Sequence, residues 1–137
     1  AGIYGPGRGP FAKLRNGTAR RIVKPGQVFS RIHVDDIAGA IMASLALPPV
    51  QSARIINLCD DQPAPPEAVI ERAAIMLGLP PPPVEPFDTA QMTAMARSFY
   101  AESKRVRNDR LRAELGYQLR HPDLVAGLTA ILQAEKA

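Results

Sequence analysis

Cysteine, tryptophan and long apolar runs are scarce or missing in this sequence of 137 residues, which has one cysteine, no tryptophan and 5% aromatic residues. A single thiol, Cys59, cannot form the disulfides that stabilise small secreted domains, which favours a reducing setting. No apolar run approaches the roughly 18 residues of a membrane-spanning helix, and the N-terminus has no signal-peptide core. We therefore expect a cytoplasmic protein without a membrane partner.

Acidic residues are missing before Asp35, although basic residues are frequent there, and the net charge is +4. A second group of Lys and Arg lies between positions 97 and 112. Such clusters can attract an anionic partner, either a nucleic acid or a phosphorylated small molecule, and the alternative is a solvated surface. Because no nucleic-acid-binding motif is present and aromatic residues are few, the sequence disfavours nucleic acid as the partner.

The length and the hydrophobic content of 46% predict one core of ordinary size, so we expect residues 1–137 to form a single unit. The chain opens with Ala1 rather than Met, and its first residues read as the end of a hydrophobic strand. We therefore expect a portion of a longer protein.

Strand signals occur in two places. Residues 20–23 and 27–29 flank a Pro-Gly turn and predict a short hairpin. Residues 53–58, ARIINL, form a continuous apolar run that is typical of a strand covered on both faces in a parallel sheet. Such a strand requires neighbours on both sides.

Helix signals are more numerous. Apolar periodicity, capping residues and Gly stops predict about five helices, with one further helical turn or two near the N-terminus. Pro80 to Pro83 predict a stiff extended linker. The expected class is α/β, or α+β for the isolated portion, with helices over 35–47, 65–77, 89–97, 108–115 and from 122 onward, and a turn or two over 11–16.

Several polar residues invite a functional reading. Asp35 and Asp36 suit a helix N-terminus and lack the further oxygens that a hard cation needs, so no metal site is predicted. His33 is more typical of support for that helix start than of proton chemistry. Cys59 has no Cys or His at motif spacing, which favours a buried small side chain. Asp60 and Asp61 follow the 53–58 segment as strand-end caps or as ligand contacts, since ligands of open α/β sheets lie at strand ends.

Three segments carry a resemblance. They are GIYGPGR at 2–8, FSRIHVDDIAGAI at 29–41 and IINLCDDQPAPPEAVI at 55–70, followed by SKRVRNDRLRAELGYQLRHP at 103–122. In this order they resemble the second half of extended short-chain dehydrogenases/reductases, particularly the atypical, sugar-nucleotide-epimerase-like branch of the epimerase/dehydratase-like members. The resemblance implies the C-terminal, substrate-binding part of a Rossmann-type fold, with its last parallel strand, and implies that the N-terminal dinucleotide-binding half is missing from this chain.

The resemblance also implies site residues. The segment at 2–8 follows the sixth strand in that family and lines the nicotinamide end of the cofactor, which implies cofactor contacts for Gly2, Tyr4, Gly5 and Pro6. Glycine permits such close approach, although an ordinary turn is the alternative. The cofactor is NAD or NADP in the longer protein, and we expect no tight binding by this chain alone.

Substrate contacts are expected from basic residues. An arginine directly before the IHVDD motif binds a diphosphate in related nucleotide-sugar enzymes, which implies this role for Arg31, and a guanidinium matches phosphate oxygens in pairs. The basic cluster beside Met92 to Lys104 favours a segment that covers the substrate. The expected substrate-binding residues are Arg8, Arg31, Arg97, Ser98 and Lys104.

Tyr100 and Lys104 spell Tyr-x-x-x-Lys, the spacing of the catalytic pair in that superfamily. On a helix the two side chains would share a face. In the family, however, the catalytic pair precedes the segment like GIYGPGR, whereas here it follows it. We therefore assign Tyr100 a packing role and predict no catalytic residue.

Two functions follow. The first is a substrate-binding lobe of an NAD(P)-dependent epimerase, dehydratase or reductase, which takes a small molecule, such as a phosphorylated compound or a nucleotide sugar, and is inactive without the N-terminal half. The alternative is a non-enzymatic ligand-binding or assembly module, in which an exposed strand edge pairs two chains as a homodimer.

Overall fold

The computed structural model describes residues 1–49 and 53–135, and these residues fall into two compact units that alternate along the chain. Unit 1 comprises Ala1–Pro6, Ser30–Gln62 and Val106–Ala137, and unit 2 comprises Gly7–Phe29 and Pro63–Arg105. Each unit is therefore assembled from segments that are distant in sequence. In the described part of the chain, no helix has both the length and the apolar character needed to cross a bilayer.

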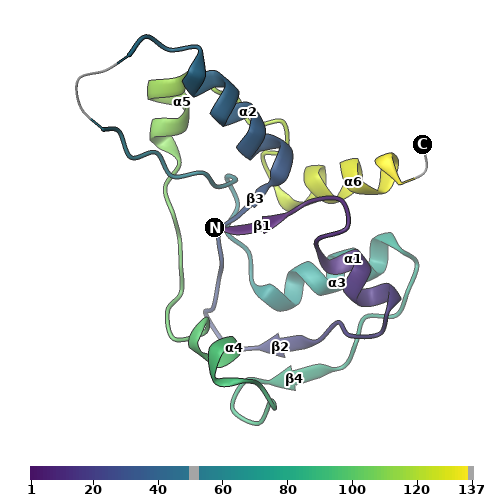
Figure 1. Cartoon of the computed structure of the whole chain (residues 1–137). Helices are drawn as coiled ribbons and strands as arrows, with labels where there is room; N and C mark the ends of the chain where they lie inside the picture. The colour runs from purple at the N-terminus through teal and green to yellow at the C-terminus, as the bar shows by residue number, and fades with distance from the viewer. Residues whose placement is uncertain (50–52, 136–137) are drawn as a thin grey trace. The chain divides into compact units, whose positions relative to one another are not determined.

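Unit 1 contains a short parallel ribbon and three helices (Figure 1). Its two strands pair in parallel, with Tyr4 opposite His33. The core contains Ile32, Leu111 and Leu128, whose side chains are at most 2% exposed. The elements are β1 (Gly2–Tyr4), β3 (Arg31–His33), α2 (Val34–Leu45), α5 (Asp109–Leu115) and α6 (Leu124–Ala134).

The three helices of unit 1 confirm the predictions over 35–47, 108–115 and from 122 onward, and in α2 and α6 a polar side chain accepts a hydrogen bond from a first-turn amide. The carboxylate of Asp123 accepts a hydrogen bond from Ala126 N at 2.8 Å and starts α6. Gly116 ends α5 in the left-handed region, at φ 62°. Capping and periodicity are local signals, which is why the sequence predicted these elements.

Unit 2 contains two strands and three helices (Figure 1). The helix predicted over 65–77 is confirmed, and Gly78 ends it at φ 67°. The helix predicted over 89–97 is shorter than expected, because Thr93 rather than Asp88 caps it, at 3.1 Å from Ala96 N. The elements are α1 (Pro10–Arg15), β2 (Arg21–Val23), α3 (Pro66–Met76), β4 (Val84–Pro86) and α4 (Ala94–Ser98).

The hairpin predicted over 20–23 and 27–29 is wrong. β2 pairs in parallel with β4, a strand that directly follows the predicted proline linker, and Arg20 forms an ion pair with Glu85 beside this ladder. The turn itself is present, because Gln27 N donates to Lys24 O at 3.0 Å. Residues 27–29 instead bond to 102–104, through Val28 N to Ser103 Oγ at 3.1 Å and Lys104 N to Val28 O at 3.1 Å. Their backbone is therefore already paired elsewhere.

The apolar segment 53–58 is not a strand in the structure. Two residues beyond the segment, Asp60 N donates to Arg31 O of β3 at 2.7 Å. Ile55 is 76% exposed. A parallel strand requires a neighbouring strand to which its backbone can hydrogen-bond. Among the described residues, no strand pairs with 53–58, so this apolar segment is not part of a sheet.

Candidate functional site

Buried polar side chains surround the N-terminus of α2 in unit 1. Asp36 is 1% exposed, and its carboxylate accepts three hydrogen bonds, from Tyr117 OH at 2.9 Å, Arg120 N at 2.7 Å and His121 N at 3.0 Å. A buried carboxylate of this kind is tolerated only when such donors replace its water. Asp36 therefore attaches the loop before α6 to the first turn of α2, a contact with distant residues that the sequence reading did not include.

His33 lies at the junction of β3 and α2. Its Nδ1 accepts a hydrogen bond from Asp35 N at 3.2 Å, which confirms the expected support of the helix start. The Tyr4 ring meets it edge-on at 5.3 Å, and the His121 ring lies 4.1 Å away, centroid to centroid. Burial lowers the pKa of His33, and the nearby His121 lowers it further. Both effects favour the neutral form of His33.

Two further buried polar groups belong to unit 1. Burial raises the pKa of Tyr4, and it raises the pKa of Asp60 to about 7, despite the backbone hydrogen bond from Gln62 and the positive charge of Arg31. Among the described residues, none hydrogen-bonds to Tyr4 Oη, to Asp60 Oδ2 or to His33 Nε2. A buried carboxylate with one free oxygen costs stability once it ionises.

Asp60 makes the stability of the chain depend on pH in a defined direction. The folded pKa of about 7 lies above the unfolded value of 3.8, so the contribution of Asp60 is fully present below about pH 4 and is lost as the pH rises through about 7. Replacing Asp60 with Asn removes this slope. We expect the free energy of unfolding of the variant, relative to the unmodified chain, to rise by on the order of 2–4 kcal/mol between pH 4 and 8.

Urea unfolding at several pH values measures this difference. The lowered pKa of His33 acts in the opposite sense, because its contribution is lost as the pH falls below the unfolded value of 6.5. His33 is present in both proteins, so subtraction of the two profiles isolates Asp60. Asp61, which is exposed and paired with Arg112, provides the matched control as Asp61→Asn. Parallel profiles for Asp60→Asn and the unmodified chain would contradict the raised pKa.

The expected cofactor residues lie at the end of β1 in unit 1. Gly2 and Pro6 are exposed, but the Tyr4 side chain is 5% exposed and packs inside the unit. A Cβ at Gly5 would lie 2.5 Å from Val34 Cγ1, so close packing against Val34 explains a glycine at this position without a cofactor. A cofactor contact of this segment would therefore use Gly2, Pro6 and the main chain, and it stays a prediction.

The expected substrate residues are divided between the units: Arg31 belongs to unit 1, whereas Arg8, Arg97, Ser98 and Lys104 belong to unit 2. Arg97 donates to Phe87 O at 3.3 Å and to Ala90 O at 2.8 Å. Ser98 Oγ donates to Met95 O at 2.8 Å, and the Lys104 ammonium lies 3.7 Å from Glu102. Arg97 and Ser98 thus hold the backbone of their own segment, and substrate binding by the set stays a prediction.

Tyr100 has the packing role that the sequence reading assigned to it. Its ring lies 5.8 Å from the ring of Phe29 and 5.1 Å from that of Phe87. The side chain of Cys59 is completely buried, as expected, and its Sγ lies 3.2 Å from Val106 O.

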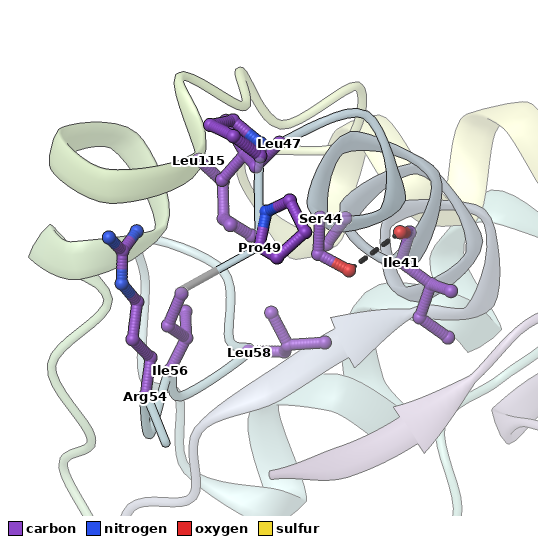
Figure 2. Close-up of a pocket in the computed structure, with 10 residues that line it drawn as sticks. Ile41, Ser44, Leu47, Pro49, Arg54, Ile56, Leu58 and Leu115 are labelled. Carbon is purple, nitrogen blue, oxygen red and sulfur yellow. Dashed lines mark hydrogen bonds between the residues drawn. The ribbon is translucent and has the colours of Figure 1, made fainter. Parts of the chain in front are cut away.

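An open groove of about 400 Å³ lies on unit 1 (Figure 2). Most of its wall is apolar, and its polar groups have partners: Ser44 Oγ donates to Ile41 O at 2.7 Å, and Arg54 lies 3.9 Å from Glu114. The sequence reading missed the groove because it placed 53–58 in a sheet. The lining residues are Ala40, Ile41, Ser44, Leu47, Pro48, Pro49, Arg54, Ile56, Leu58 and Leu115.

Comparison with known proteins shows what the chain is similar to. No family model matches the chain. It is 31% identical to a 3-diazoavenalumate denitrifying reductase from a Streptomyces species, over 92% of this chain and 43% of that protein. It is 28% identical to a putative NAD-dependent epimerase/dehydratase from Methylobacillus flagellatus, with a TM-score of 0.62 over 100% of this chain and 46% of that one. The chain is related to the NAD-dependent epimerase/dehydratase proteins.

Two further solved structures are similar to the chain. A conserved protein of unknown function from Silicibacter pomeroyi is 58% identical, with a TM-score of 0.90 over 98% of this chain and 47% of that one. The human epimerase family protein SDR39U1 with NADPH shares the fold at 23% identity, with a TM-score of 0.76 over 96% of this chain and 45% of that one. The chain spans about half the length of the relatives that it matches. The expected resemblance to short-chain dehydrogenases/reductases is confirmed, and so is an α/β portion with parallel strands.

Proposed function

We propose that this chain is the substrate-binding, C-terminal portion of an NAD(P)-dependent epimerase, dehydratase or reductase, and that activity requires the other half of such a protein. The observation that carries the proposal is the match of nearly the whole chain to less than half of each relative, one of which is described with NADPH and another as a reductase. The substrate is a small molecule whose anionic groups the basic residues would attract.

The apolar surface of unit 1 supports the need for a second half. Ile41, Met42 and Leu45 on α2 are 51%, 65% and 73% exposed, and Ile55 is 76% exposed. An apolar patch of this kind is typical of a surface that another part of a protein covers. The unpaired segment 53–58 supports the same conclusion, because a parallel sheet in the missing half would supply its partner edge.

Cofactor binding by a reconstituted protein tests the proposal. We expect no NADPH affinity for the chain alone and clear affinity when it is joined to the part of the Silicibacter pomeroyi protein that it does not cover. That protein is suitable because its matching part is 58% identical to this chain. NADPH fluorescence titration measures both. The control is the Silicibacter part alone, because any NADPH binding by that part does not depend on residues 2–6 of this chain.

Two outcomes distinguish the proposed function from the alternative, the non-enzymatic assembly module. If the joined protein folds but binds neither NADPH nor NADH, the cofactor-dependent assignment is wrong. A chain that forms a stable homodimer in sizing experiments and buries Ile41 and Ile55 there would favour the assembly module, since these side chains are exposed in the single chain.

A further inference from the structure

The start of α2 brings together two metal-ligand side chains that are close in sequence, His33 and Asp35, and a third that is distant, His121. His33, Asp35 and His121 each offer one ligand atom, and these atoms all lie within 4.8 Å of one another. His33 Nδ1 and His121 Nε2 each lie 3.6 Å from Asp35 Oδ2. Two ligands of a tetrahedral ion at about 2.1 Å are separated by about 3.4 Å, so these two distances need little adjustment.

We propose that His33, Asp35 and His121 bind a divalent transition-metal ion of the zinc type. Two imidazoles and one carboxylate are a ligand set that Zn²⁺ accepts, with a remaining position for water or another ligand. Softer or harder ions fit less well, because the set contains no thiolate and only one carboxylate. The site lies wholly within unit 1 and does not depend on the proposed cofactor function.

The local chemistry prepares these ligands. Because His33 Nδ1 accepts a hydrogen bond from the Asp35 amide, its ring proton is on Nε2, which is the tautomer that Nδ1 ligation requires. The His33 and His121 side chains are 2% and 12% exposed, while that of Asp35 is 55% exposed, so an ion has a solvent-facing entry beside the carboxylate.

Binding replaces one existing hydrogen bond. The ion takes the Nδ1 lone pair from the Asp35 amide, and that amide then hydrogen-bonds to water at the exposed helix start, which lowers the net affinity for the ion. The Nε2 proton of His33 has no acceptor among the described residues, whereas ligating histidines commonly have one. The site is therefore reversible and weaker than a closed structural zinc site.

Titration of the untagged chain with Zn²⁺, and with Co²⁺ as a spectroscopic probe, tests the site. We expect one ion per chain, a Co²⁺ visible band of low symmetry and a higher melting temperature with Zn²⁺. Asp35→Asn and His121→Ala should each lower the affinity by at least about tenfold. His121→Cys should restore binding and add a thiolate charge-transfer band, which identifies position 121 as a direct ligand.

The controls keep the test decisive. Asp109 is an exposed carboxylate in the first turn of α5, so Asp109→Asn removes the same charge from the first turn of another helix and should leave the affinity unchanged. Asp35→Asn changes an exposed side chain and should leave the circular dichroism spectrum intact. Stoichiometry other than one, or equal affinity for the unmodified chain, Asp35→Asn and His121→Ala, would overturn the proposal. Because the readout needs no nicotinamide, failure here is separate from failure of the cofactor assignment.

Discussion

Replacing Asp36 with Ala is expected to lower the free energy of unfolding by about 3–5 kcal/mol, the cost of removing one partner from a buried charged network. The substitution leaves three donors, Tyr117 OH and the amides of Arg120 and His121, without their acceptor in the interior of unit 1. It also leaves a cavity where the carboxylate stood. Since a small domain is stable by only about 5–15 kcal/mol, a loss of this size removes a large fraction of the total stability.

Thermal and urea unfolding measure this loss, and two variants separate its causes. Asp36→Asn keeps the shape but turns an amide group toward a backbone N–H, so it recovers only part of the stability. Asp35→Ala, measured with a chelator present, removes the neighbouring carboxylate, which is exposed, and should cost less than about 1 kcal/mol. Similar losses for Asp35→Ala and Asp36→Ala would show that helix-terminal charge, rather than the buried network, is what matters.

The elements that could be predicted from sequence are those with local causes. The helices over 34–45, 66–76 and 109–115 follow from apolar periodicity and from residues that start or stop a helix. The pairing of β2 with β4 could not be predicted, because it joins short segments that are far apart in the chain. The Pro-Gly turn at 25–26 favoured a hairpin, but the backbone of 27–29 is paired with 102–104 instead.

In the candidate site, too, the features with local causes could be predicted from the sequence and those that depend on distant residues could not. The roles of His33 at the helix start and of Cys59 as a buried side chain depend on neighbours in sequence or on residue type, and both were predictable. The approach of His121 to His33 depends on the loop that Asp36 holds, so no local pattern indicates it. One sequence feature is consistent with the pair: His33 and His121 are the two histidines of the sequence. That count alone does not predict that they lie close together.

Replacing Gly127 with Ala is expected to destabilise the chain by about 2–3 kcal/mol, although the same change at an open helix position would stabilise by up to about 1 kcal/mol. The new Cβ would lie 2.1 Å from Tyr4 Oη and 2.7 Å from two carbons of its ring. Tyr4 cannot move aside easily, because it is 5% exposed and its ring packs edge-on against His33. The sign of the change in the free energy of unfolding therefore shows whether Tyr4 of β1 is held in place against α6.

A double-mutant cycle with Tyr4→Phe tests this explanation. Phe lacks the oxygen nearest to the new Cβ, and because Tyr4 Oη has no hydrogen-bond partner among the described residues, Tyr4→Phe alone should cost little. We expect it to recover part of the loss in Gly127→Ala, which urea unfolding of the four proteins measures as a coupling energy. Gly39→Ala is the matched control: its Cβ would lie 2.2 Å from Tyr117 Oη, so it should also destabilise, but Tyr4→Phe should not rescue it. Equal rescue of both glycine variants, or none of either, would mean that the contact between Tyr4 and Gly127 does not set the stability of unit 1.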